Sequence, residues 1–364
     1  MKLRTGCRAM ADHEPVRGRT LLAYRGHVRS KRVFIMMLLA LTAAAVIISA
    51  SVGAVSIPFG QVISFLARFD RQGSGRIIWD VRMPRIIAAV LVGSGLSVSG
   101  TVMQSVLRNP LASPYTLGIS SAAAFGASFA IVFLQAGNSS SSSIVVSSPH
   151  IVTISAFSFS VLATFAVLVI IRYTRVSAEA LVLAGIAIGS ICTAGLTLMQ
   201  YLADSVQLAH IVSWSFGDLG RATWNINLIT LAVLLPVYLL CFLYRWDFNA
   251  MEGGEDSAKG LGIRTGRLRV AAMIGASMVT AVMVSFFGII AFIGLLGPHI
   301  TRRVIGSDHR FLLAASPLVG AGILLVSDTA ARTLLSPMVL PVGILTSLLG
   351  GPLFIYLLVG RVKR

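Results

Sequence analysis

The stretch VAAMIGASMVTAVMVSFFGIIAFIGLLGPHIT, residues 270–301, decides the fold. It contains no Lys, Arg, Asp or Glu, and as a single helix its 32 residues would extend about 48 Å. The hydrocarbon core of a bilayer needs only about 20 apolar residues. Gly288 lies in the middle of the stretch and Gly297-Pro298 near its end. We therefore predict two short transmembrane helices that separate near Gly288.

Uncharged blocks of this kind recur along the whole chain. The others are residues 33–55, 86–107, 111–171, 180–203, 222–244, 311–327 and 333–360. Surface helices of a soluble protein show a polar face, and only 12% of these residues are charged, against about 25% in ordinary globular domains. The chain is therefore predicted to be an all-α polytopic membrane protein.

The number of spans follows from block length and charge. Block 111–171 is interrupted by the polar run 137–143, so we expect two spans there, and the split at Gly288 raises the total to ten. An even number places both basic termini on one side. This arrangement puts 23 of the 30 Lys and Arg residues in the cytoplasm, as the positive-inside rule requires. Without the split, the three arginines within 302–310 would face outward.

The charge distribution also divides the chain into regions. Residues 1–32 carry nine Lys and Arg and are predicted to be a retained basic cytoplasmic tail, because no clean signal-peptide cleavage site follows the first block. Residues 33–360 form the transmembrane domain, and 361–364 are a cytoplasmic C-terminus. The net charge of +17 is explained by topology, so no nucleic-acid partner is expected.

The sequence lacks the motifs that would predict a nucleotide site or a metal site. There is no G-x-x-x-x-G-K-[ST] motif, so we expect no nucleotide site and no enzymatic activity on this chain. Cys7, Cys192 and Cys241 are far apart and have neither metal-ligand nor disulfide spacing. No metal site or bound cofactor is predicted.

Block 86–107 carries small residues four apart, such as Gly93 and Ser97. Such stripes let membrane helices approach closely. Helix packing alone would explain them. Alternatively, part of this face, including Ser97 and Gln104, lines a translocation path.

Three arginines fall in segments predicted to face outward. Arg82 and Arg85 flank Pro84, which suits the first turn of a helix. Cations at a helix N-terminus oppose the macrodipole, so this pair indicates either an acidic partner or contacts with lipid headgroups. Arg332 follows Asp328 by four residues, and such a pair is structurally ordinary.

The predicted cytoplasmic segment 245–269 contains GGEDSAKGLG at 253–262. Residues 255–261 are expected to form a short helix bounded by glycines. Such a helix is either a docking element for a soluble partner or a solvated connector.

Six motifs now occur in one order: RMPR (82–85), RNPLASPYTLGIS (108–120), GEDSAKGLG (254–262), FIGLLGPHITRRVIGSDHR (292–310), SDTAART (327–333) and LPVGILTSLLGGPLF (340–354). Together they resemble the FecCD-type permeases, the membrane subunits of ABC importers for iron–siderophore complexes, haem and cobalamin. The resemblance implies the type II ABC importer permease architecture, with ten transmembrane helices in each subunit of a dimer.

The resemblance also implies partners and a location. The second permease would be identical or a paralogue, and two separate ATPase subunits would hold ATP and Mg²⁺. A substrate-binding protein would dock outside. The location implied is the bacterial inner membrane, with both termini in the cytoplasm.

Residue roles carry over only where the motifs match. Arg82, Arg85 and Arg332 match arginines that receive acidic residues of the binding protein. Five residues match the helix that inserts into the ATPase: Gly254, Glu255, Ala258, Leu261 and Gly262.

Two further positions are compared with the family. Ser177, Ala178 and Glu179 fall where it places an inner gate. Val339 stands where a Glu often precedes the LPVG motif, so any role of that carboxylate is absent or relocated.

The predicted function is transport of a ferric siderophore or related iron chelate by alternating access. Cobalamin or haem is the alternative cargo. An ion-coupled secondary transporter would need charges within its spans, and these spans offer almost none. A membrane receptor or scaffold would not need six transporter motifs.

Overall fold

The structure is a computed structural model that describes residues 14–53, 57–68, 73–136, 148–173 and 178–362, and these ranges contain helices and no strand. The helices are α2 (Glu14–Ser51), α3 (Phe59–Arg68), α4 (Ser74–Arg76), the π-helix η1 (Ile77–Arg82), α5 (Met83–Val106), α6 (Ile119–Val132), α7 (Pro149–Tyr173), α8 (Ala178–Leu202), α9 (Ser205–Ser215), the 3₁₀-helix η2 (Leu219–Arg221), α10 (Trp224–Leu243), α11 (Arg245–Glu252), α12 (Glu255–Gly260), α13 (Thr265–Phe287), α14 (Ile293–Ile305), α15 (His309–Thr333) and α16 (Val342–Val362).

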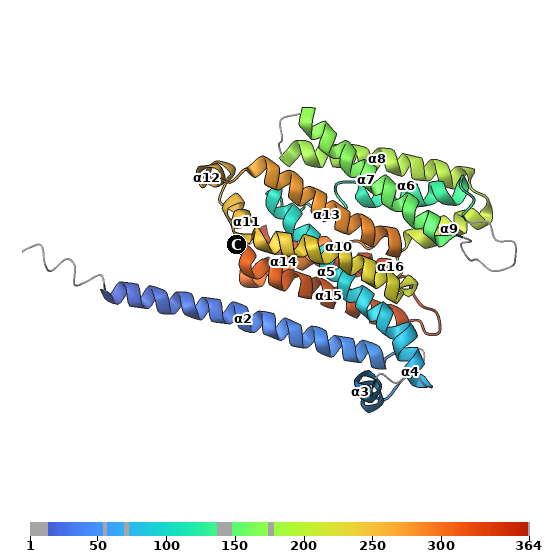
Figure 1. Ribbon diagram of the computed structural model, residues 1–364, viewed down its shortest axis with the longest axis horizontal. Helices are drawn as coiled ribbons and strands as arrows, with labels where there is room; N and C mark the ends of the chain where they lie inside the picture. The colour runs from blue at the N-terminus through green and yellow to red at the C-terminus, as the bar shows by residue number, and fades with distance from the viewer. Residues whose placement is uncertain (1–13, 54–56, 69–72, 137–147, 174–177, 363–364) are drawn as a thin grey trace, which may run out of the picture.

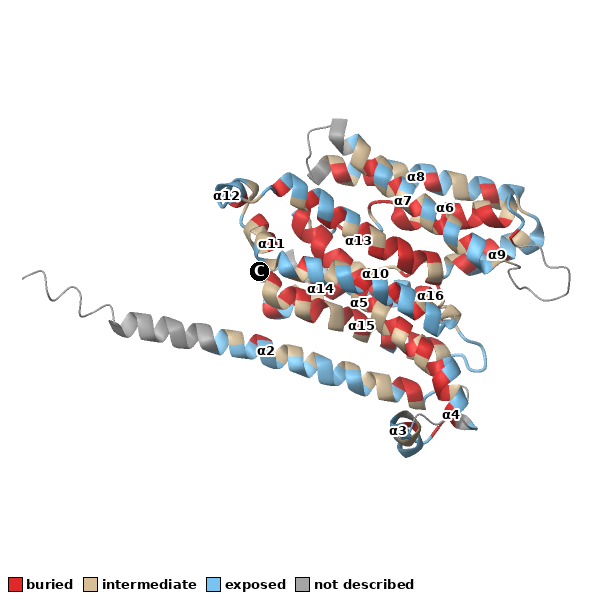
Figure 2. Cartoon of the chain, viewed as in Figure 1, coloured by how far each residue is buried: buried red, intermediate tan, exposed pale blue. Residues whose placement is uncertain are grey.

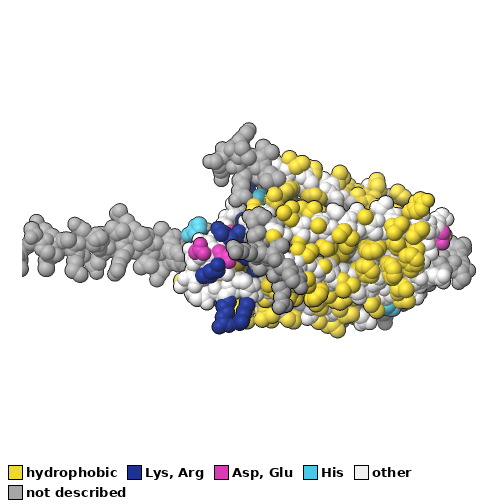
Figure 3. Space-filling view, turned by 90° about the horizontal axis from the view of Figure 1, so that it is seen from above, with side chains coloured by type: hydrophobic (Ala, Val, Ile, Leu, Met, Phe, Trp, Pro, Cys, Tyr) yellow, Lys and Arg dark blue, Asp and Glu magenta, His cyan; other side chains and the backbone are white. Residues whose placement is uncertain are grey.

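The polytopic membrane fold is confirmed. Seven described segments are long and apolar enough to cross a bilayer: Gly26–Ser51, Ile77–Val106, Pro149–Ile170, Ala180–Leu202, Trp224–Leu243, Thr265–Phe287 and His309–Thr333. The apolar segments Ile119–Val132 and Val342–Tyr356 are shorter, and α14 has 13 residues. Apolar side chains cover the length of the face seen in Figure 3, and charged side chains gather near one end of it. That all ten helices cross the membrane remains a prediction.

The long helices lie side by side, and their connections fall at two ends of the bundle (Figure 1). We call one the α12 end, which holds α11, α12 and residues 302–310. The other is the α4 end, which holds α3, α4 and the end of α15. The helix α2 lies along one edge and packs against α15.

The predicted break at Gly288 is confirmed. The helix α13 ends at Phe287, and the chain turns at Gly288 with a φ of 75° before α14 begins. A Cβ atom at Gly288 would lie 2.4 Å from the carbonyl oxygen of Trp214, so only glycine fits. Arg302 Nη1 then lies 3.1 Å from Glu252 Oε1. The arginines within 302–310 therefore share the α12 end with segment 245–269, as predicted.

Pro84 lies in the first turn of α5, as expected, but this turn is not the start of the helical backbone. The backbone is already helical from Ser74, and a π-helical segment precedes α5. The Met83 N–H donates to the Ile78 carbonyl, five residues back, immediately before the proline that has no N–H of its own. Arg82 and Arg85 therefore lie two turns or more inside a continuous helix, and the argument from the macrodipole does not apply to them.

The helix α5 forms the centre of the bundle and is buried along most of its length, together with much of α13 and α15 (Figure 2). Its small residues allow this packing. A Cβ atom at Gly93 would lie 2.5 Å from the carbonyl oxygen of Gly320 on α15. At Gly100 it would lie 1.7 Å from that of Gly294 on α14. The stripe of small residues therefore does pack helices closely.

Other boundaries differ from the sequence prediction. The first helix begins at Glu14, well inside the predicted tail 1–32. The segment between blocks 180–203 and 222–244 contains α9, whose N-terminus is capped by the Asp204 carboxylate. The serine run 139–143 lies outside the described residues.

Cysteine labelling will test which way the bundle faces. Ser205 and Ser307 are exposed at opposite ends. We expect Ser205→Cys to react with a membrane-impermeant maleimide from outside the cell, and Ser307→Cys to react only after the membrane is opened. Labelling of Ser307→Cys in intact cells would show that the assigned topology is inverted, or that α14 does not bring the chain back to the cytoplasmic side.

Candidate functional site

A buried carboxylate organises the α4 end. The Asp328 side chain is fully buried and accepts hydrogen bonds from Arg85 Nε at 2.8 Å and from Arg332 Nε at 3.1 Å. Arg85 Nη2 also lies 3.6 Å from Asp218 Oδ1. One carboxylate thus holds two guanidinium groups from different helices in fixed positions.

Arg332 also helps to anchor the first helix, α2, together with Arg82. Arg82 Nη1 donates to the carbonyl oxygens of Ala50 and Ser51 at 2.5 and 3.1 Å. Arg332 Nη2 donates to Ser49 Oγ at 2.6 Å. The last carbonyl groups of a helix lack partners within the helix and carry partial negative charge, so cations are favoured there. The two arginines therefore cap the C-terminus of α2.

The three predicted docking arginines are thus brought together, but they turn inward. Arg82 is 5% exposed, and the side chains of Arg85 and Arg332 are 13% and 9% exposed. Arg76, at the same end, is 79% exposed in its side chain. A role in docking remains a prediction. The structural role as a clamp on α2, α5 and α15 was not foreseen, because no local sequence signal pairs residues so far apart.

A line of polar contacts, which we call the α5–α15 seam, continues from this cluster. Ser97 Oγ donates to the Ser316 carbonyl at 2.7 Å, and Thr101 Oγ1 lies 2.6 Å from Ser316 Oγ. Nearer the α12 end, Ser105 Oγ hydrogen-bonds His309 Nε2. Buried hydroxyl groups that find partners across helices hold their relative register.

The seam ends on the α11 segment. His309 donates its backbone N–H to Asn249 Oδ1 at 2.7 Å, and its Nδ1 lies 3.6 Å from Glu252 Oε2. Asn249 Nδ2 in turn donates to Asp308 Oδ1 at 3.1 Å. Burial alone would raise the pKa of Asp308, but hydrogen bonds from Arg310 and Asn249 lower it to about 2. The Asp308 carboxylate is therefore ionised at neutral pH and keeps its hydrogen bonds to Arg310 and Asn249.

A second junction joins α12 to α5. Arg269 Nη2 lies 3.0 Å from Glu255 Oε2, and its Nε donates to the carbonyl oxygen of Val106 at 3.0 Å. Lys259 Nζ lies 3.1 Å from the other Glu255 oxygen. The hydrogen bond from Arg269, followed by that from Lys259, lowers the pKa of Glu255. Stability from this carboxylate is lost only when the pH falls through its lowered pKa, so it persists at neutral pH.

The expected short helix with glycines at both ends is confirmed. Gly254 and Gly262 have φ values of 125° and 83°, which side-chain-bearing residues rarely adopt. Ala258 is fully buried in an apolar cluster that includes Phe248 and Met251 of α11, whereas Leu261 is 73% exposed. The helix α12 is thus anchored in the bundle through Ala258, and Leu261, which follows the helix, is exposed. Docking of this segment on an ATPase remains a prediction.

The structure describes the side chains of only two of the candidates for a translocation path, Ser97 and Gln104. Ser97 lies fully buried in the seam, and the buried Gln104 side chain has no hydrogen-bond partner within the described part of the chain. Ser177 lies outside the described residues. Ala178 and Glu179 begin α8. Their roles in a path or gate remain predictions.

A cavity of about 210 Å³ lies between α5, α13, α14 and α16. Leu96, Ser113, Tyr115 and Ser347 are among its lining residues, and Ser97 and Gln104 are not. Ser113 and Tyr115 belong to the RNPLASPYTLGIS motif, for which the sequence predicts no binding site. Val339, in the position of the missing Glu, is exposed between α15 and α16.

Comparisons with known proteins agree with this arrangement. The FecCD transport family matches residues 41–360. A candidate ABC transporter permease protein, MJ0087 of Methanocaldococcus jannaschii, is 46% identical over 94% of this chain and 98% of its own length. The hemin transport system permease protein HmuU of Yersinia pestis is 37% identical over 91% of this chain and 96% of its own.

One solved structure has the same fold over nearly its whole length. It is an inward-facing conformation of a candidate metal-chelate type ABC transporter. The TM-score is 0.76 at 30% sequence identity, and the match covers 90% of this chain and 99% of the other.

Proposed function

This chain belongs to the FecCD transport family, and on that premise we propose that it carries a ferric siderophore or a related iron chelate across the membrane. It is a permease of the metal-chelate, haem or vitamin B12 type of ABC importer. ATP is hydrolysed by a separate subunit, and the permease itself performs no chemistry.

The observation that carries the proposal of ATP-driven transport is the physical connection between the α4 end and the α12 end of the bundle. Asp328 joins α5 and α15 at the α4 end, and the seam joins them along their length. At the α12 end, His309 attaches the pair to α11 and Arg269 attaches it to α12. We propose that these helices move as one unit, so that displacement of α12 by an ATPase reaches the outer surface.

The proposed assembly has two permeases, two ATPase subunits and one substrate-binding protein in the bacterial inner membrane. The binding protein docks at the α4 end, and the α12 end faces the cytoplasm with both termini. The 210 Å³ cavity is small for a ferric chelate, which favours a path formed together with the second permease.

Haem is the second candidate cargo. The 37% identity to the hemin permease HmuU over nearly the full length of both chains favours it. Haem is also an iron chelate, so both candidates require that the metal arrive already complexed.

Transport by the reconstituted complex will test the function. Proteoliposomes with the permease, its ATPase and its binding protein should take up a ferric chelate when ATP is enclosed. We expect no uptake of uncomplexed Fe³⁺ or Zn²⁺. A series of ferric siderophore, haem and cobalamin will identify the cargo. Efficient uptake of the bare ion would refute the proposal.

Docking by Arg85 will be tested through its salt dependence. Arg85→Gln should lower the association rate of the binding protein roughly tenfold at low salt, because complementary charge mainly accelerates encounter. It should also flatten the dependence of that rate on ionic strength. Arg303→Gln removes an exposed cation at the α12 end and serves as the control. In a variant that still assembles, an unchanged rate and salt slope would leave Arg85 with its structural role alone.

A further inference from the structure

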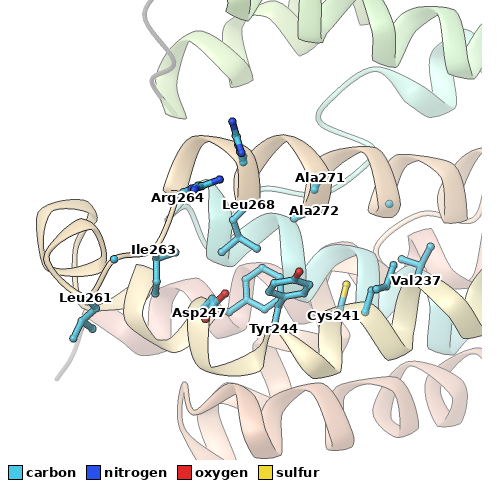
Figure 4. A pocket seen from close by; sticks show the side chains of 15 residues that line it. Val237, Cys241, Tyr244, Asp247, Leu261, Ile263, Arg264, Leu268, Ala271 and Ala272 are labelled. Atoms are coloured by element: carbon cyan, nitrogen blue, oxygen red, sulfur yellow. The ribbon is translucent and has the colours of Figure 1, made fainter.

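A second, larger cavity lies at the α12 end, away from the seam. Its volume is about 670 Å³, within the range of about 300–1,000 Å³ typical of ligand sites. It is formed by the last part of α10, the start of α11, the segment that follows α12 and the first part of α13 (Figure 4). The transport cycle proposed above involves Leu261 and Gly262 at its edge but gives the cavity itself no role.

The cavity is a wedge between two helices predicted to cross the membrane. A Cβ atom at Gly275 on α13 would lie 3.2 Å from Val237 Cγ1 on α10, so the two helices nearly touch there. Towards the α12 end they are separated by the side chains of Tyr244, Asp247 and Leu268 (Figure 4). The wedge therefore widens from the apolar interior of the bundle towards its charged end.

The narrow part of the wedge is apolar. Val237, Leu240, Cys241, Ala271 and Ala272 line it, and all five belong to helices long and apolar enough to span a bilayer. Leu240 and Ala271 are exposed. A hydrocarbon chain can therefore enter from the membrane and replace water against these walls.

The wide part of the wedge is basic. Arg264 and Arg267 line it and are exposed, and neither side chain has an ion-pair or hydrogen-bond partner within the described part of the chain. Asp247 is the third charged residue of the lining, so one positive charge remains in excess. Both arginines border the wide part, and guanidinium groups suit a phosphate, which accepts several hydrogen bonds from arginine.

We propose that this wedge is a binding site for an anionic phospholipid. The acyl chain lies between α10 and α13, and the phosphate is held by Arg264 and Arg267. The site also includes Leu261 and Gly262, so a bound lipid touches the segment that follows α12. A soluble phosphate compound would use only the basic part and leave the apolar walls exposed.

Lipid retention by the purified full-length permease will test the site. Native mass spectrometry should show that wild type retains phosphatidylglycerol more tightly than phosphatidylcholine with the same acyl chains. Each arginine near an anionic headgroup contributes on the order of a fivefold gain in affinity. Arg264→Gln with Arg267→Gln should therefore abolish most of the preference. Arg303→Gln, which removes a cation at the same end but outside the wedge, should retain it.

A second variant tests the apolar part. Ala271→Trp fills the wedge from an exposed position and should reduce retention of phosphatidylglycerol with both arginines still present. Equal retention of the two lipids by wild type, or an unchanged preference in the double arginine variant, would overturn the proposal. Binding of glycerol 3-phosphate as tight as that of the lipid would also overturn it. None of these measurements needs the ATPase, the binding protein or transport, so they stand apart from tests of the proposed function.

Discussion

Replacement of Asp328 with alanine is expected to destabilise the permease by about 3–5 kcal/mol, the range for removal of one partner from a buried ion pair. The loss would leave two guanidinium groups, those of Arg85 and Arg332, without the carboxylate that both now contact. Because Arg332 also holds the C-terminal end of α2, we expect that helix to detach at the α4 end. Thermal unfolding in detergent and protease accessibility of residues 57–68 will measure these two effects.

Asp80→Ala supplies the matched control for this variant. Asp80 also pairs with an arginine at the α4 end, Arg76, but the two side chains are 42% and 79% exposed. Exposed pairs of this kind contribute about 0–1 kcal/mol. Similar losses of stability in the two variants would contradict the central role assigned to Asp328.

Charge reversal at Glu255 is expected to abolish uptake while the protein still inserts into the membrane. Glu255→Arg places a cation next to Lys259 and Arg269, where a carboxylate now accepts hydrogen bonds from both. The start of α12 should then separate from Arg269 and so from the end of α5. Co-purification of the ATPase and uptake by proteoliposomes are the two measurements, and deletion of residues 254–262 should give the same result.

Glu255→Gln is the control for this experiment. The amide keeps the volume of the side chain and one oxygen that can accept from Arg269, so we expect it to retain part of the uptake. Normal uptake in Glu255→Arg or in the deletion variant would exclude α12 as the coupling element.

The sequence by itself determined the class of fold and much of its layout. Blocks longer than the bilayer requires, with basic residues between them, are local signals that no tertiary contact can reverse. The break at Gly288 and the short helix between Gly254 and Gly262 were equally readable, because a positive φ is a local demand that glycine meets. The six ordered motifs also indicated the family to which the chain belongs.

Only the tertiary structure decided what the charged side chains do. Arg85 and Asp328 are 243 residues apart, and Arg332 and Ser49 are 283 apart, so nothing in either neighbourhood identifies the partner. An arginine next to a proline looks the same in sequence whether it faces another protein or pairs with a carboxylate on a distant helix. Which it does depends on the burial of its guanidinium group, because a buried charge must find its partner within the fold. The lipid wedge likewise exists only where α10 and α13 diverge, a property of two helix axes and not of any one segment.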